Sequence, residues 1–256
     1  MSRTPLLWLP WPVFWAELLG TLVLVALGCS LVILDFGIGS PVSKLLPDAL
    51  ARRVLTGFLF GSIGALIALS WVGRESGAHI NPIVTLAFWL LGKLKGRYVP
   101  GYLLAQLLGG ALGGLPLLLW GTMGQSVQYA ATVPGTAGPG VALIGETVTT
   151  FLLVVGLFFF VGQPCLRRYT PLLFPFLYAL MVGLEAPLSG TSTNPARSLG
   201  PALVAGVWTD YWLYWAGPLL GLGLGLWLLY NLPQLEAEVA KLYHFQHDPH
   251  RIFRLD

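Results

Sequence analysis

Long apolar runs alternate with short polar connections along the whole chain. Six of these runs approach or exceed the roughly 20 residues that a helix needs to cross a hydrocarbon core of about 30 Å. The runs are Pro12–Leu34, Val54–Trp71, Pro100–Gly121, Val141–Gly162, Leu172–Pro187 and Tyr211–Tyr230. This pattern predicts an all-α membrane protein with six transmembrane helices.

Two further apolar runs, Pro82–Leu91 and Pro195–Val204, are about ten residues long and too short to span a bilayer. Each follows an Asn-Pro pair, formed by Asn81 in the first half and Asn194 in the second. Asn is a favoured N-cap and Pro a favoured first helical residue. We therefore expect two re-entrant half-helices, each beginning at its Asn-Pro pair.

The two halves repeat the same order of elements. Residues 12–121 and 141–231 each contain a first span with a buried carboxylate, Glu17 or Glu146, then a span, a half-helix and a glycine-rich third span. Three spans are an odd number, so the second copy must enter the membrane from the opposite side. The chain is thus predicted to be an inverted repeat, an arrangement that normally holds its transport site near the midplane.

Composition agrees with a membrane protein, because charged residues are only 10% of the chain and the mean hydropathy is +0.74. The loops 73–99 and 163–171 are rich in Lys and Arg, whereas the loop 122–140 carries no charge. The positive-inside rule then predicts both termini in the cytoplasm, with the plasma (inner) membrane as the expected location. No basic run with interleaved aromatic residues suggests nucleic acid as a partner.

Residues 232–256 form a polar tail, expected to be cytoplasmic, that contains His244, His247 and His250. Their spacing of three suggests a metal site, but a solvated tail is the favoured interpretation. We expect neither a metal nor another cofactor.

The paired Asn-Pro motifs, Arg197 three places after Asn194, and the two intramembrane glutamates occur together and in order. In this combination the chain resembles the major intrinsic protein family, the aquaporins and glycerol facilitators, over about residues 12–231. The resemblance implies a single channel domain over residues 1–256, folded as a right-handed bundle, with one pore per protomer in a homotetramer. It also implies passive passage of water, with glycerol, urea and ammonia as further candidates, and no enzymatic activity.

The resemblance assigns the pore motifs to two triplets, Asn81, Pro82 and Ile83, and Asn194, Pro195 and Ala196. Asn side chains that cap their helices direct amide donors into the lumen and interrupt a proton-conducting water chain. The two helix N-termini add about half a positive charge each, which excludes ions and protons. Ile83 stands where the family has Ala, so it must repack or approach the lumen.

By counting from the Asn residues without gaps, the resemblance assigns the selectivity filter to Gly61, Val182, Thr191 and Arg197. Such a filter would be wide and weakly polar, whereas a shift by one residue would place Phe60 in it. Arg197 lines the pore, pairs with Glu185 or extends to the lipid headgroups. Glu185 either faces the outer vestibule or holds the Arg197 loop. Tyr214 with Trp215, and Ser198 after the arginine, are typical of water channels.

Two alternatives to a passive channel remain at this point. A coupled secondary transporter would use Glu17 and Glu146 as a proton relay, although the resemblance favours a structural role in which they bind loop N–H groups. His79 either lines the inner vestibule or is structural. A membrane-embedded enzyme would need a catalytic cluster, and the sequence offers no such motif.

Overall fold

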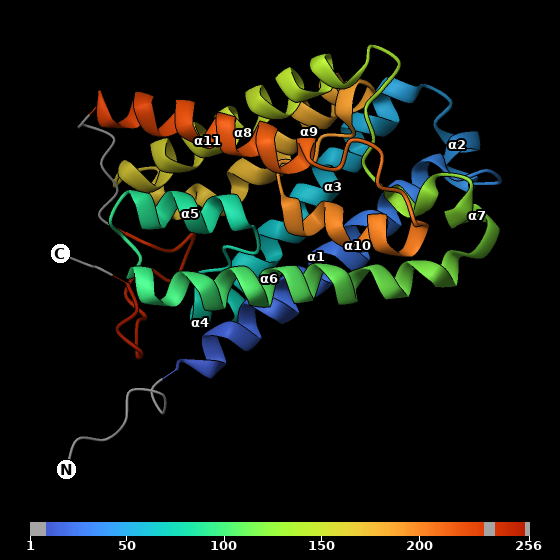
Figure 1. Ribbon diagram of the computed structural model, residues 1–256. Helices are drawn as coiled ribbons and strands as arrows, with labels where there is room; N and C mark the ends of the chain where they lie inside the picture. The colour runs from blue at the N-terminus through green and yellow to red at the C-terminus, as the bar shows by residue number, and fades with distance from the viewer. Residues whose placement is uncertain (1–8, 233–238, 254–256) are drawn as a thin grey trace.

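A computed structural model of the protein describes residues 9–232 and 239–253 and forms an elongated helical bundle (Figure 1). Within this part of the chain, six helical segments are long and apolar enough to cross a membrane, as predicted. Five are the single helices α1 (Trp11–Phe36), α3 (Ala49–Leu69), α8 (Pro139–Gly162), α9 (Thr170–Ser189) and α11 (Leu213–Tyr230). The remaining span consists of η2 (Gly96–Tyr98), α6 (Val99–Gly114), η3 (Leu115–Trp120) and α7 (Gly121–Gln125).

The two short apolar runs form α5 (Pro82–Leu90) and α10 (Pro195–Ala205), and both lie inside the bundle (Figure 1). Their bounds are within a residue of the predicted half-helices, because the Asn caps and the following prolines set their first turns. The remaining short helices lie in the connections: α2 (Pro41–Leu45), α4 (Trp71–Ser76), η4 (Gln128–Ala130) and η5 (Arg167–Tyr169).

Helix pairing follows the repeat. Helix α1 packs against α6 in the first half, α8 packs against α11 in the second, and the equivalent helices α3 and α9 pack against each other between the halves. Glycine allows the closest approaches. A Cβ atom on Gly110 of α6 would lie 2.1 Å from the carbonyl oxygen of Ala196, and one on Gly200 of α10 would lie 2.2 Å from that of Gly110. The half-helix α10 therefore rests on α6 by backbone contact.

Both described ends of the chain lie at one end of the bundle, which we call the terminal face (Figure 1). Residues 239–253, the tail segment, fold back onto this face, and the prediction of a solvated tail is wrong. Ala240, Lys241 and Ile252 are at most 1% exposed, and Val239, Leu242 and Phe253 are also buried. The tail lacks helical periodicity, so its burial depends on hydrogen bonds and ring contacts that no simple pattern shows.

Candidate functional site

The loop before α5 is held by the carboxylate of Glu17. Its Oε1 atom accepts hydrogen bonds from Ser76 Oγ at 2.6 Å and from the backbone N–H of His79 at 2.9 Å. Its Oε2 atom accepts from the N–H of Ile80 at 2.6 Å and from Gln106 Nε2 at 2.7 Å. Four donors on one buried carboxylate satisfy it without a cation. Glu17 is therefore built into the scaffold.

Glu146 holds the loop before α10 in the same way. Its Oε1 atom accepts from Ser189 Oγ at 2.7 Å and from the N–H of Ser192 at 2.6 Å, and its Oε2 atom accepts from the N–H of Thr193 at 2.8 Å. The two carboxylates thus bind equivalent groups in the two halves. This arrangement agrees with the structural role and leaves no oxygen of Glu146 unpartnered.

Both loops contain strained backbone. Positive φ angles occur at equivalent positions, at Gly77 (89°), Ala78 (52°) and Ile80 (41°), and at Gly190 (86°), Thr191 (49°) and Thr193 (54°). β-Branched residues rarely adopt this region, at a cost of about 1–3 kcal/mol each, and such strain persists only where the surroundings fix it. The hydrogen bonds to Glu17 and Glu146 supply that fixation.

A second matched pair of contacts was not predicted from the sequence. The hydroxyl of Tyr102 on α6 donates to the carbonyl oxygen of Ser76 at 2.7 Å, and that of Tyr214 on α11 donates to the carbonyl oxygen of Ser189 at 2.8 Å. The sequence signal is that in both loops a Ser-Gly pair and an Asn-Pro pair are separated by three residues. Each serine thus binds a glutamate through its side chain and a tyrosine through its backbone.

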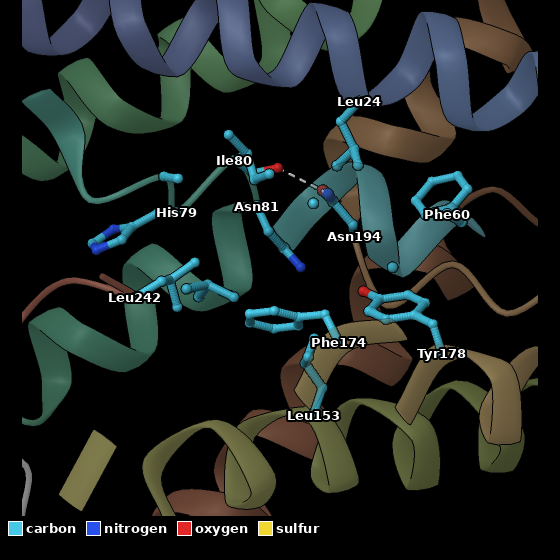
Figure 2. A pocket seen from close by; sticks show the side chains of 14 residues that line it. Leu24, Phe60, His79, Ile80, Asn81, Leu153, Phe174, Tyr178, Asn194 and Leu242 are labelled. Carbon is cyan, nitrogen blue, oxygen red and sulfur yellow. Dashed lines mark hydrogen bonds between the residues drawn. The ribbon is translucent and has the colours of Figure 1, made fainter. Parts of the chain in front are cut away.

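The two asparagines meet in the middle of the bundle. The Oδ1 atom of Asn81 accepts from the N–H of Ile83 at 2.9 Å, and that of Asn194 accepts from the N–H groups of Ala196 and Arg197 at 3.0 and 3.3 Å. The amide nitrogen of Asn81 donates to the carbonyl oxygen of Thr193 at 3.0 Å. That of Asn194 donates to the carbonyl oxygen of Ile80 at 2.9 Å (Figure 2). Each NH₂ group has two donors, so one N–H per asparagine remains beyond these cross-bonds.

Asn81 and Asn194 line a narrow central cavity, with His79 and Leu242 to one side and Phe60 and Tyr178 to the other (Figure 2). The cavity offers about 50 Å³ to water molecules. At roughly 10–15 Å³ for each water, this volume has room for about three to five water molecules. Most of the other lining side chains are apolar: Leu24, Ala78, Ile80, Val84, Leu153 and Phe174. Neutral molecules can hydrogen-bond at the asparagines but at few other side chains.

Arg197 lies in the wall of a second cavity, on the side of the bundle away from the terminal face. This cavity offers about 310 Å³ to water and is also lined by Val182, Thr56 and Ala130. Arg197 is 5% exposed, and its Nη1 atom donates to the carbonyl oxygen of Ala130 at 2.9 Å. Arg197 thus faces this cavity, and its guanidinium hydrogen-bonds a backbone carbonyl.

The filter position expected at Gly61 lies at the wall of the central cavity. A Cβ atom on Gly61 would lie 2.3 Å from the carbonyl oxygen of Phe174, so this residue faces α9 and serves helix packing, although its backbone borders the central cavity. The neighbouring side chain of Phe60 lies 5.8 Å from Arg197 Cζ and stacks on Tyr178 with 6.0 Å between ring centroids. Phe60 also borders the central cavity, so Gly61 and the residue before it both lie beside the space that the asparagines line.

The remaining predicted residues take identifiable places. Ile83 is fully buried in the main hydrophobic cluster. His79 is 1% exposed, and its ring stacks on Phe88 at 4.7 Å and borders the central cavity. Glu185 accepts a hydrogen bond from Thr191 Oγ1, so it holds the loop that leads to Arg197.

Comparisons with known proteins agree with this geometry. Residues 8–230 match the sequence profile of the family described as Major intrinsic protein. The chain belongs to this family. It is 35% identical over 222 residues to aquaporin NIP1-1 of Zea mays, covering 85% of this chain and 73% of that protein. It is also 35% identical over 252 residues to the lens fiber major intrinsic protein of Gallus gallus, covering 93% and 88% of the two chains.

Among solved structures, the aquaglyceroporin from Plasmodium falciparum matches with a TM-score of 0.70 at 20% identity, covering 89% of this chain and 99% of that one. This match supports the aquaporin-like fold. As a member of the major intrinsic protein family, the protein is a passive multi-pass membrane channel for water and small neutral solutes. The alternative of a coupled transporter is not supported, because Glu17 and Glu146 are bonded to the loops they hold.

Proposed function

We propose that the conduit passes water in single file past Asn81 and Asn194 and excludes ions and protons. The observation that carries this proposal is the meeting of two helix N-termini, each capped by an asparagine amide, in one narrow cavity. Each terminus contributes about half a positive charge, which opposes cations. The guanidinium of Arg197 adds a full positive charge beside the second cavity.

We further propose that Phe60, Tyr178 and Arg197 form the selectivity filter, together with Thr191 and Val182 nearby. Two stacked rings beside a buried cation leave little room and offer few hydrogen-bond partners. This filter favours water over the bulkier glycerol, in contrast to the wide filter that Gly61 would have given.

Stopped-flow light scattering on proteoliposomes tests this proposal. Replacing the ring in Phe60→Ala should raise glycerol permeability relative to water severalfold. The matched control is Phe58→Ala, which removes a ring that is 38% exposed on the outer surface and packs on Phe176. Equal water-to-glycerol ratios in the native protein and both variants would refute the role of Phe60.

For orientation, we propose that the terminal face is cytoplasmic. The loops 73–99 and 163–171, which carry six of the fourteen Lys and Arg residues, both contact the tail segment at this face. Cys165 lies exposed in the second of these loops and Cys29 is buried. A membrane-impermeant maleimide should therefore label Cys165 only in lysed cells, and labelling in intact cells would reverse the orientation.

We also propose a homotetramer in the plasma (inner) membrane with one conduit per protomer. The support is the family resemblance together with the exposed apolar residues along the outer helices, such as Leu66, Leu184 and Trp227. Native mass spectrometry from mild detergent should give a mass of four chains. A monomer under conditions that retain water permeability would argue against assembly.

A further inference from the structure

The tail segment spans the opening of the conduit at the terminal face. On one side, Lys241 Nζ donates to the carbonyl oxygen of Arg74 at 2.6 Å. Between the sides, the N–H of Leu242 donates to the carbonyl oxygen of Gly77 at 3.4 Å. On the far side, the N–H of Lys95 donates to the carbonyl oxygen of Ile252 at 3.1 Å. The segment therefore contacts α4, the first re-entrant loop and the α5–α6 connection together.

The contact with the conduit itself is direct. The Leu242 side chain is one wall of the central cavity that Asn81 and Asn194 line (Figure 2). The carbonyl oxygen of Ala240 lies 3.2 Å from Nε2 of His79, another residue of that wall. Water leaving the asparagines toward the terminal face thus meets the backbone and an apolar side chain of the tail.

The far end of the tail segment is anchored as firmly as its start. Leu94 and Phe253 form an antiparallel bridge, and Lys95 Nζ donates to the carbonyl oxygen of Arg251. The ring of Phe253 lies 5.0 Å from Lys241 Nζ, which joins the two ends of the segment. A loose tail beside the opening would not need anchors on both sides of it.

Two histidines beside Glu75 complete the docking. His247 Nε2 and His250 Nε2 lie 3.5 and 3.9 Å from the two carboxylate oxygens of Glu75, and all three side chains are partly exposed. Contacts of this kind contribute little net free energy, because water replaces them readily. A reversible closure requires that the docked arrangement exchange with a released one.

We infer that the tail segment, residues 239–253, is an autoinhibitory plug that closes the terminal mouth of the conduit and opens it by undocking. The inference rests on the channel function described above. Undocking would remove Leu242 from the cavity wall and the Ala240 carbonyl from His79, and would leave His79 at an open vestibule.

Full-length point variants test the plug. In Leu242→Glu, a carboxylate replaces a side chain that is 4% exposed, and the cost of burying an unpaired charge drives the tail out. Water permeability per channel should rise roughly tenfold if about nine tenths of native channels are docked. Gln246→Glu is the matched control, because it adds the same charge to the same segment at an exposed position and should leave the permeability unchanged.

A reversible lock gives an independent measurement. Paired residues of an antiparallel bridge have Cα atoms about 4.5–5.5 Å apart, within the range of a disulfide. The double variant Leu94→Cys with Phe253→Cys, in a Cys165→Ser background, should lose permeability on oxidation and regain it on reduction. The single variant Leu94→Cys in the same background should not respond.

The outcomes separate the plug from the channel. Water permeability above that of empty liposomes, equal in native protein and Leu242→Glu and unaffected by the lock, would overturn the plug and keep the channel. Permeability at the level of empty liposomes in every form, with correctly folded protein, would overturn both. If Leu242→Glu fails to fold, a conducting double variant that oxidation does not close overturns the plug on its own.

Discussion

The two re-entrant loops have nearly the same internal bonding but different outer neighbours. In both, a serine and two backbone N–H groups bind a glutamate, a tyrosine binds the serine carbonyl, and an asparagine caps the half-helix. The first loop is then covered by the tail segment, whereas the second leads to Arg197 beside a cavity of about 310 Å³. The shared parts fix the centre of the conduit, and the differences give its two ends different tasks.

Among changes to the two loops, removing a carboxylate should lower the stability of the protein most. In Glu146→Gln, an NH₂ group replaces one acceptor, so a buried N–H of Ser192 or Thr193 loses its partner at a cost of about 1–3 kcal/mol. Glu17→Gln should cost a similar amount. We expect both variants to give little monodisperse protein in detergent, with a lowered melting temperature for what remains. Native-like melting of either variant would show that its loop is held by something else.

Removing the two asparagine caps should lower the melting temperature by different amounts, and by less than removing a glutamate. Asn194 accepts from two N–H groups and Asn81 from one, while each makes one cross-bond. Loss of a cap costs about 1 kcal/mol, so Asn194→Ala should lower the melting temperature more than Asn81→Ala. Both should also reduce water permeability. Thermal unfolding followed in detergent checks the order, and the reverse order would show that the cross-bonds outweigh the caps.

The tyrosines should give the closest match between the halves. Tyr102→Phe and Tyr214→Phe each delete one hydroxyl that binds a serine carbonyl, worth about 0.5–1.5 kcal/mol. We expect equal, modest losses of thermal stability. Tyr230→Phe is the control, because its hydroxyl also binds a backbone carbonyl but is exposed. If only one of the two variants lost thermal stability, the two matched hydrogen bonds would contribute unequally to stability despite their similar geometry.

The smallest expected effect is a pH dependence confined to the tail-covered end. Burial lowers the pKa of the Lys241 ammonium from 10.5 to about 8; its charged or titratable neighbours are Asp248, Glu75, Glu17 and His79. Between about pH 8 and 10.5 the docked tail binds fewer protons than a released one, so rising pH favours docking.

Water permeability should therefore fall when the pH at the terminal face rises from about 7 to about 9.5. Lys241→Gln keeps a donor for the Arg74 carbonyl but removes the titration, so its permeability should stay level across this range. A native protein that behaves like Lys241→Gln would exclude Lys241 as the source of any pH response.

Much of the fold could be predicted from the sequence because it depends on local signals. Apolar runs gave the spans, and the caps at Asn81 and Asn194 gave the half-helices within a residue. The residues of the proposed filter were harder to predict. Counting to Gly61 assumes equal spacing, and one residue of difference rotates a helical position by about 100°. That rotation exchanges a glycine that packs on α9 for the ring of Phe60.

The tail could not be predicted for a different physical reason. Its docking depends on the backbone carbonyls of Arg74 and Gly77 and on that of Ala240, which contacts His79. Every residue has a backbone carbonyl, so such contacts leave no signal in the sequence. Its polar composition also matches that of a solvated segment. The matched Ser-Gly signals at Ser76 and Ser189, in contrast, are visible in the sequence once the two loops are aligned on their Asn-Pro pairs.

The bonds from each asparagine amide to a backbone carbonyl of the opposite loop have a consequence for biosynthesis. Asn81 must find the carbonyl of Thr193, which lies 112 positions later in the chain. While the ribosome is still extending the second half, the first half-helix sits in the membrane with that amide donor unmatched. The hydrogen bonds between the halves thus form only late in translation. One half expressed alone would need a second copy of itself, inserted in the opposite orientation, to form the same bonds.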